Sequence, residues 1–220
     1  MVDFAEARRM MVDGQIRTND VTDTRILVAF GEIPRERFVP PQLAELAYLD
    51  KDLRIAEGPQ PRYLLKPMVL ARLIQALDLG ARDKVLDVAC GTGYSSAIMA
   101  KLAGQVVGLD SDAALTESAA RVLRELGIAN ASFTTGPLPA GAPAEAPYEA
   151  ILINGLVERP SETILDQLRD GGRLVCVVRH GPIGRATLYR SVGGDVSGRA
   201  LFDAAAPLLP EFTAPPAFVF

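Results

Sequence analysis

Short apolar runs alternate with amphipathic segments along most of this 220-residue chain, from residue 67 onward. The apolar runs have the length of buried strands and lie at 84–89, 105–109, 131–135, 148–153 and 172–178. Segments with helical spacing of apolar residues separate them and lie at 67–80, 94–102, 112–126 and 161–169. Strands and helices that alternate in this way form βαβ units with a parallel sheet. The sequence therefore predicts an α/β fold with a doubly wound, Rossmann-like sheet.

The C-terminal part of the chain departs from this alternation. Glycines and an aspartate at 193–195 separate the runs 185–192 and 199–202, which predicts an antiparallel hairpin added to the mostly parallel sheet. The residues that follow, 204–216, are rich in alanine and proline. We expect them to form a connection or a surface tail rather than a domain linker.

The N-terminal part also lacks the alternation. Apolar residues have helical spacing at 4–15 and again after 20–23, whereas 54–65 contains several glycines and prolines and indicates an extended loop. We therefore expect two parts, an N-terminal helical extension with this loop at 1–66 and the sheet domain at 67–220.

Composition and charge exclude several classes of protein. Acidic residues outnumber basic ones by 27 to 23, and a net charge of −4 argues against non-specific electrostatic binding to nucleic acid or anionic membrane. Two cysteines, Cys90 and Cys176, and the single His180 are too few for a disulfide framework or a usual zinc site. No apolar run has the ~18 residues of a membrane helix, and no signal peptide is recognisable. We expect a cytoplasmic protein with free thiols and no bound metal.

The most informative stretch lies where the first predicted strand meets the following helix, at Val85–Tyr94. Gly91 and Gly93 allow the backbone of this turn to approach a ligand closely. Such a turn places the ligand at the carboxyl ends of the strands, at the switch point of the sheet. Asp110 ends the second predicted strand, where a carboxylate is placed to accept both hydroxyls of a ribose.

The glycine pattern distinguishes two classes of ligand. A dinucleotide requires a third glycine for its pyrophosphate, but Gly93 is followed by Tyr94, Ser95 and Ser96. Asp87, inside the strand, is placed to bind an amino group directly or through water. A ligand with an amino acid end and a ribose but no pyrophosphate is S-adenosylmethionine (SAM).

The same stretch resembles motif I of class I methyltransferases. That motif usually reads (D/E)-x-G-x-G-x-G, and this chain has Asp87 at its start and Ala89 at its first glycine. The resemblance implies a class I fold that holds SAM with motif I and with the end of the next strand. The residues expected to contact the cofactor are Asp87, Ala89, Gly91, Gly93, Tyr94, Asp110 and Ser111.

Three further blocks resemble protein-L-isoaspartate O-methyltransferases in particular. Residues 33–40 read IPRERFVP, against VPRHLFVP in that family. Residues 146–153 read APYEAILI, against APYDAIIV, and residues 167–175 read QLRDGGRLV, against QLKPGGRLV. The similarity extends over most of the chain.

This resemblance implies a SAM-dependent enzyme that methylates the abnormal carboxyl group of isoaspartyl residues, so that damaged aspartates return to normal through a succinimide. Its partners are then isoaspartyl-containing proteins or peptides, or another carboxylate acceptor, without nucleic acid or membrane. A carboxylate nucleophile is already ionised at pH 7, so positioning supplies most of the rate and no strong base is required.

The segment before residue 67 departs from the family pattern, which reads approximately G-x-T-I-S-x-P. Aligned on Pro67, Tyr63 stands at the family's threonine and Leu65 at its serine, the hydroxyls that handle the acceptor carboxylate. Leucine forms no hydrogen bond, and it desolvates an anion. Three cations are candidate replacements for these contacts, or otherwise solvated surface charges: Arg62, Lys66 and Arg179.

A second departure lies after the third predicted strand, where Pro137 replaces an aspartate that contacts the adenine side in the family. These differences leave three functions open. The chain is an isoaspartyl methyltransferase with a remodelled acceptor loop, a methyltransferase of the same fold with another acceptor, or a SAM-binding or fold-only protein that acts through interactions. The catalytic residues stay unassigned.

Overall fold

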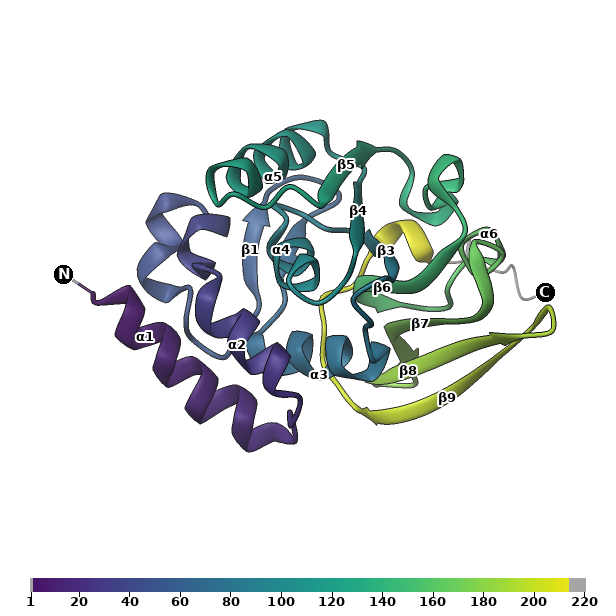
Figure 1. Cartoon of the computed structure of the whole chain (residues 1–220), viewed down its shortest axis with the longest axis horizontal. Coiled ribbons are helices and arrows are strands. Elements are labelled where there is room, and N and C mark those ends of the chain that lie inside the picture. Colours follow the sequence, from purple (N-terminus) through teal and green to yellow (C-terminus); the bar gives the residue numbers. More distant parts are fainter. Residues whose placement is uncertain (1, 214–220) are drawn as a thin grey trace.

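The computed structural model describes residues 2–213 and contains a seven-stranded mixed sheet (Figure 1). The strands are β3 (Lys84–Val88), β4 (Gln105–Asp110), β5 (Ala131–Thr135), β6 (Tyr148–Val157), β7 (Leu168–His180), β8 (Ile183–Val192) and β9 (Asp195–Asp203). Their order is β5-β4-β3-β6-β7-β8-β9, parallel from β5 to β7 and antiparallel from β7 to β9. The predicted Rossmann-like sheet with a C-terminal antiparallel hairpin is confirmed.

The helices of the sheet domain are α3 (Pro67–Leu77), α4 (Tyr94–Ala100), α5 (Ala113–Glu125) and the short α6 (Glu162–Leu165). Pro67 occupies the first turn of α3, where its missing N–H costs nothing, and the Asp112 carboxylate caps α5. Two boundaries differ from the prediction. Asp78, with φ +47°, ends α3 before Gly80 is reached, and the predicted helix at 161–169 shortens because β7 already begins at Leu168.

The N-terminal extension packs against the sheet domain. It consists of α1 (Phe4–Met11), a π-helical turn at Val12–Ile16, α2 (Thr24–Glu32) and 3₁₀ turns at Arg35–Phe38 and Pro41–Leu46. Phe30 and Phe38 contact the ring of Tyr94 edge-on, with centroids at 6.0 and 5.3 Å. Buried side chains from both sides of the expected boundary at 66/67 therefore belong to one apolar cluster.

Residues 54–65 do not form the expected extended loop. They contain an antiparallel hairpin of β1 (Leu53–Ala56) and β2 (Arg62–Leu64), with Leu53 opposite Leu64. Leu53, Ile55 and Leu64 are buried, so the alternation of apolar residues, hidden by the Pro- and Gly-rich turn between the strands, decides the local structure. The hairpin covers the turn after β3, where Ile55 lies against Gly91.

The expected C-terminal tail is wrong for residues 204–213, and 214–216 lie outside the described residues. From β9 the chain returns across the carboxyl edge of the sheet (Figure 1, yellow). Leu156 N donates to Pro207 O at 2.7 Å, and Leu209 N donates to Leu156 O at 2.9 Å. Leu209 and Phe212 are buried, so apolar side chains hold this segment in place. No helix between residues 2 and 213 is long and apolar enough to span a membrane.

Candidate cofactor site

The turn between β3 and α4 has three residues in the left-handed region of the backbone. These are Ala89 with φ +56°, Gly91 with φ +55° and Gly93 with φ +90°. Glycine adopts this conformation without a steric penalty, whereas an alanine is strained by its Cβ. The geometry thus explains why motif I usually has glycine at the position of Ala89.

The two glycines of the turn face different neighbours. A Cβ added at Gly91 would lie 2.6 Å from Cδ1 of Ile55, on the side covered by the hairpin. A Cβ added at Gly93 would lie 2.8 Å from the Cβ of Ala119 and 3.1 Å from Cδ1 of Leu123. The missing side chain at Gly91 therefore allows the hairpin to lie close to the turn, and the missing side chain at Gly93 allows α5 to pack closely.

Asp87 lies fully buried near the carboxyl end of β3 and is surrounded by hydrogen-bond donors. Ser95 Oγ donates to its Oδ2 at 2.7 Å, Ser96 donates to the same oxygen, and Asn154 Nδ2 donates to Oδ1 at 2.6 Å. Burial raises the pKa of Asp87 to about 6 although these three hydrogen bonds oppose the shift. At pH 7 the carboxylate is mostly ionised and suited to a cationic amino group.

Asp110 lies fully buried at the carboxyl end of β4, and its carboxylate accepts from three donors of the protein. Its Oδ1 accepts from Arg62 Nε at 3.0 Å and from Asp112 N at 3.2 Å. Its Oδ2 accepts from Gly91 N at 2.9 Å and from Arg62 Nε at 3.3 Å. A carboxylate offers about four acceptor positions, and the Nε–H of Arg62 is one donor shared by both oxygens. Three donors thus leave at most one position, which is too few for both hydroxyls of a ribose in this arrangement.

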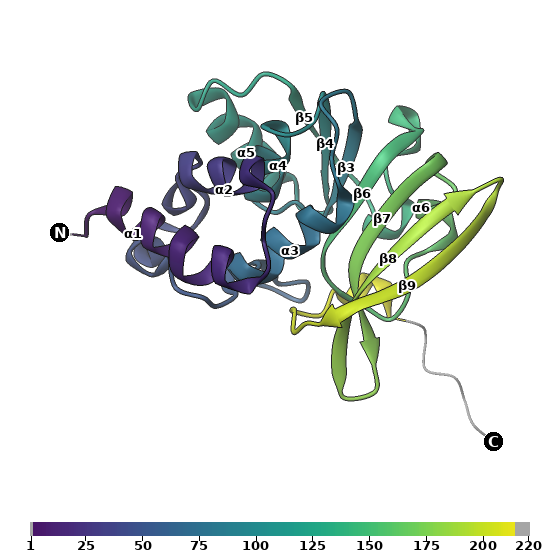
Figure 2. The ribbon, with the colours of Figure 1, turned by 60° about the horizontal axis from the view of Figure 1, so that its bottom comes forward.

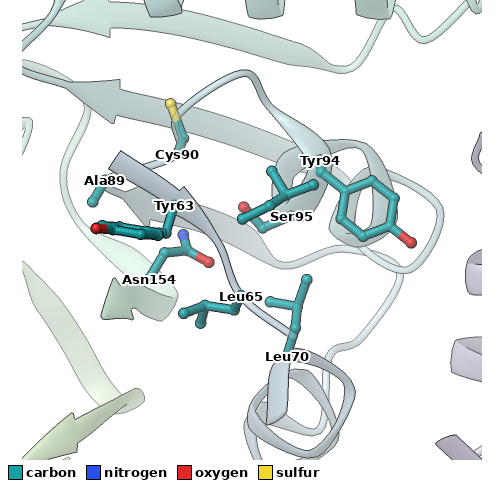
Figure 3. Close-up of a pocket in the computed structure, with 9 residues that line it drawn as sticks. Tyr63, Leu65, Leu70, Ala89, Cys90, Tyr94, Ser95 and Asn154 are labelled. Atoms are coloured by element: carbon teal, nitrogen blue, oxygen red, sulfur yellow. The ribbon is translucent and has the colours of Figure 1, made fainter. Parts of the chain in front are cut away.

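A narrow cavity of about 10 Å³ lies between the hairpin and the motif I turn, which is room for about one water molecule. Tyr63 and Leu65 of the hairpin segment point toward Ala89 and Asn154 (Figure 3). Leu65 is 2% exposed. The two residues that replace the family's hydroxyls therefore border motif I directly.

The structure brings together most of the predicted cofactor residues, but not all by their side chains. Asp87, Ala89, Gly91, Asp110 and Ser111 surround the carboxyl ends of β3 and β4. Tyr94 contributes part of its ring to the cavity wall, while its hydroxyl points away from the cavity (Figure 3). The guanidinium of Arg35 lies 4.8 Å from the centre of that ring, so Tyr94 mainly anchors the N-terminal extension.

The three cations proposed to contact the acceptor lie in different environments in the structure. Arg62 is 2% exposed and bound to acidic side chains, so it is not a solvated surface charge. Lys66 is half-buried, and its backbone N–H donates to Asp52. Arg179 is exposed near the tip of the β7–β8 hairpin, which projects beyond the body of the molecule (Figure 2).

Sequence reasoning missed two polar residues of the site. Asn154 directly follows the buried run 148–153, and a polar residue at the carboxyl end of a central strand is a signal that could have identified it. Glu211 contacts Arg62 and lies 3.3 Å from Ser111 Oγ. No local pattern marks Glu211, because its partners are about 100 residues or more away in the chain.

The remaining reactive groups do not add chemistry to this site. Cys90 is buried beside the turn, and burial raises the pKa of its thiol well above its usual value, so it stays an unreactive thiol. Cys176 is buried in β7, and burial likewise raises the pKa of its thiol. Within residues 2–213, no group of His, Cys, Asp or Glu side chains is arranged to hold a metal ion.

The chemical groups of the site match those that SAM requires. Two buried carboxylates, Asp87 and Asp110, stand where the sequence predicts contacts to an amino group and to ribose hydroxyls, and the turn between them has little side chain. One side chain opposes this match, because Arg62 holds the oxygen atoms of Asp110 that a ribose requires. The residues thus fit the cofactor once Arg62 releases Asp110.

Comparison with known proteins identifies the family of the chain. The model of the protein-L-isoaspartate(D-aspartate) O-methyltransferase family matches residues 6–198. A relative from Methylorubrum extorquens, named protein-L-isoaspartate O-methyltransferase, is 39% identical over 188 residues, which is 86% of this chain and 80% of the relative. A relative from Anaeromyxobacter sp. (strain Fw109-5), named protein-L-isoaspartate O-methyltransferase 2, is 39% identical over 168 residues, or 76% and 68% of the two chains.

Solved structures give the same result for the fold. A protein-L-isoaspartate O-methyltransferase superposes with a TM-score of 0.78 and 26% identity, covering 92% of this chain and 65% of that longer chain. A Plasmodium falciparum protein described as a putative enzyme of this kind, in complex with S-adenosyl-L-homocysteine, gives a TM-score of 0.76 at 18% identity, over 93% of this chain and 98% of that one. From the family match and these identities, we conclude that the chain belongs to the protein-L-isoaspartate(D-aspartate) O-methyltransferase family.

Proposed function

We propose that this protein transfers a methyl group from SAM to the abnormal carboxyl group of an isoaspartyl residue in a protein or peptide. Membership of the family supports this function. The observation that carries it is the pair of fully buried carboxylates, Asp87 and Asp110, on either side of the Gly91 turn. Burying a charge is costly, and these two acids lie on either side of the turn, where an amino group and a ribose of the cofactor would require them.

The two acids have different roles in this proposal. Asp87 would bind the amino group of the cofactor, since Ser95, Ser96 and Asn154 keep the carboxylate oriented. Asp110 would accept the ribose hydroxyls, with Gly91 N–H fixing one of its oxygens. When bound, SAM supplies a sulfonium methyl group for attack by a carboxylate oxygen.

The acceptor side needs orientation rather than acid–base chemistry. The carboxylate of the acceptor is ionised at pH 7, so this chain's task is to hold it in line at about 3 Å and to exclude water. Tyr63 and Leu65 border the cavity at the motif I turn. Of these two residues, only Tyr63 has a hydroxyl, as the family's threonine and serine do, and Leu65 offers only an apolar surface.

Methyl transfer to a defined peptide tests this function. The protein is incubated with tritiated SAM and an isoaspartyl peptide, and the matched peptide with a normal aspartate is the control. Base-labile label on the isoaspartyl peptide alone is the expected result. Absence of label above the aspartyl control, with SAM binding intact in calorimetry, would exclude this acceptor.

A different acceptor is the second candidate, and one observation favours it. The cavity wall at the family's serine position is Leu65, with Leu64 and Leu70 beside it. Such a wall suits a carboxylate with an apolar body better than a peptide backbone. Under this alternative, small carboxylic acids with an apolar substituent accept the methyl group and the isoaspartyl peptide does not.

The two cysteines support a proposal about the compartment in which the reaction takes place. Cys90 and Cys176 are both free and buried in the structure. Free thiols persist in a reducing compartment, which supports action in the cytoplasm on damaged proteins.

A further inference from the structure

Arg62 joins three segments that are far apart in the sequence. It lies on β2, and its side chain is 3% exposed. The guanidinium donates to Asp110 at the end of β4 at 3.0 Å, to Ser111 Oγ at 2.7 Å, and to Glu211 in the C-terminal segment. The hairpin β1–β2 and the C-terminal segment are thereby fastened to the edge of the sheet where the cofactor is expected.

The contact between Arg62 and Asp110 competes with the expected cofactor contact. Two of the donors to Asp110 are backbone groups, Gly91 N and Asp112 N, and these are fixed by the fold. The Nε–H of Arg62, shared between the two oxygens, takes one of the two acceptor positions that the backbone donors leave. Asp110 therefore cannot accept both hydroxyls of a ribose while it accepts from Arg62.

We propose that Arg62 is an internal competitor of the cofactor, which closes the site by occupying Asp110 and must leave it before SAM binds. This inference rests on the proposed function, because it assigns the ribose to Asp110. The affinity for SAM then depends on the difference in free energy between two contacts of Asp110, one with Arg62 and one with the ribose.

Glu211 gives Arg62 a second partner. An arginine that leaves a buried carboxylate would otherwise lose its only counter-charge, and an unpaired buried charge is strongly destabilising. Arg62 contacts the Glu211 carboxylate as well as Asp110, so it keeps one ion pair after it releases the other. Glu211 thus makes the opening of the site easier, although it belongs to the closed arrangement.

This competition predicts effects of opposite sign on stability and on binding. Replacing Arg62 by methionine leaves Asp110 buried without its ion pair, so the ligand-free protein should melt at a lower temperature. The same change frees Asp110 for ribose hydroxyls, so SAM should bind at least tenfold more tightly. A residue with a purely structural role would lower both.

The test is isothermal titration of SAM into the full chain, with a melting curve of each ligand-free variant. The variants are wild type, Arg62→Met and the polar Arg62→Gln, which keeps a measurement available where the methionine variant folds poorly. Arg173→Met is the matched control, because Arg173 is also largely buried and paired with an aspartate, Asp83. It should lower the melting temperature and leave the affinity for SAM within about twofold.

A second arm tests the role of Glu211. Glu211→Gln should weaken SAM binding several-fold in the presence of Arg62, because the displaced guanidinium then lacks a partner. In the Arg62→Met background the same substitution should have no effect on affinity, since the two residues act through one contact.

Each outcome decides the proposal. Tighter binding by both Arg62 variants supports it, including the case in which only the variants bind SAM. Equal or weaker binding by the variants, with a wild type that binds SAM, overturns the competition and leaves the proposed function intact. Failure of the wild type and of every variant to bind SAM overturns both.

Discussion

Asn154 on β6 donates its side-chain amide to Asp87 on the adjacent strand β3, with Nδ2 and Oδ1 separated by 2.6 Å. Asn154 Nδ2 also lies 3.2 Å from the backbone oxygen of Val88, which fixes the orientation of the amide. The contact ties the two central strands together at the carboxyl edge of the sheet. It also aims a carboxylate whose pKa burial raises to about 6.

Asp87 should make the stability of the protein dependent on pH. Its pKa is about 6 in the folded state against an ordinary value of 3.8, so the unfolded chain loses this proton first. The stabilising contribution of the protonated form is therefore complete below about pH 4 and is lost as the pH rises through 6. At about 1.4 kcal/mol per pKa unit, the loss is on the order of 3 kcal/mol.

Asp87→Asn removes this titration, and its stability relative to wild type should rise between pH 4 and pH 7. Urea unfolding at several pH values measures the difference. Asp166→Asn, at an exposed carboxylate, is the control and should change nothing. Parallel pH profiles for wild type and Asp87→Asn would contradict the assignment. At pH 7 the same variant should weaken SAM binding, because the charge opposite the amino group is gone.

Ala89→Gly should stabilise the protein. An alanine in the left-handed conformation costs about 1–2 kcal/mol of stability, which glycine avoids. The greater freedom of glycine in the unfolded chain offsets about 0.5–1 kcal/mol of this gain. The expected gain is up to about 1 kcal/mol, or a few degrees in Tm. Ala120→Gly, inside α5, is the control and should lose about 1 kcal/mol. A lower Tm for Ala89→Gly would show that packing of the Ala89 methyl group outweighs the strain.

The chemistry of the motif I turn was predictable from the sequence, whereas the segments that close the site were not. The positions of Asp87 and Asp110 follow from short-range rules, because a parallel strand that runs into a glycine turn ends at the binding edge. The hairpin at 53–64 is hidden because its turn, 58–61, contains glycine and two prolines. The contact of Arg62 with Glu211 joins residues 149 positions apart, which no local pattern encodes.

Gly91 and Gly93 should differ when each gains a side chain. Gly91→Val places a branched residue at φ +55° against Ile55, so we expect a folded but less stable protein with SAM affinity reduced at least 100-fold. Gly93→Ala drives a Cβ into Ala119 on α5, so we expect a loss of about 1–3 kcal/mol in stability and SAM affinity within a few-fold. Calorimetry and thermal melts of both variants separate the two effects. Equal loss of SAM affinity in both would contradict the distinct roles.

Tyr63 and Leu65 stand where the family has its threonine and serine, and we expect isoaspartyl methylation by the wild type to be weak. A missing hydrogen bond to a carboxylate costs about 1.5–3 kcal/mol, or roughly 10- to 150-fold in rate when it is felt in the transition state. Leu65 is 2% exposed and borders the motif I turn, so it also desolvates an anion placed there.

Tyr63→Thr combined with Leu65→Ser should raise the rate on an isoaspartyl peptide by that factor, measured with tritiated SAM. The matched control is Tyr63→Thr with Leu64→Ser, because Leu64 is also buried and lines the same cavity. The control should lose a similar amount of stability without gaining activity. Wild-type turnover equal to that of the restored variant would show that another donor, such as Lys66, already holds the acceptor. A restored variant that binds SAM and gains nothing would place the acceptor contacts elsewhere in the site.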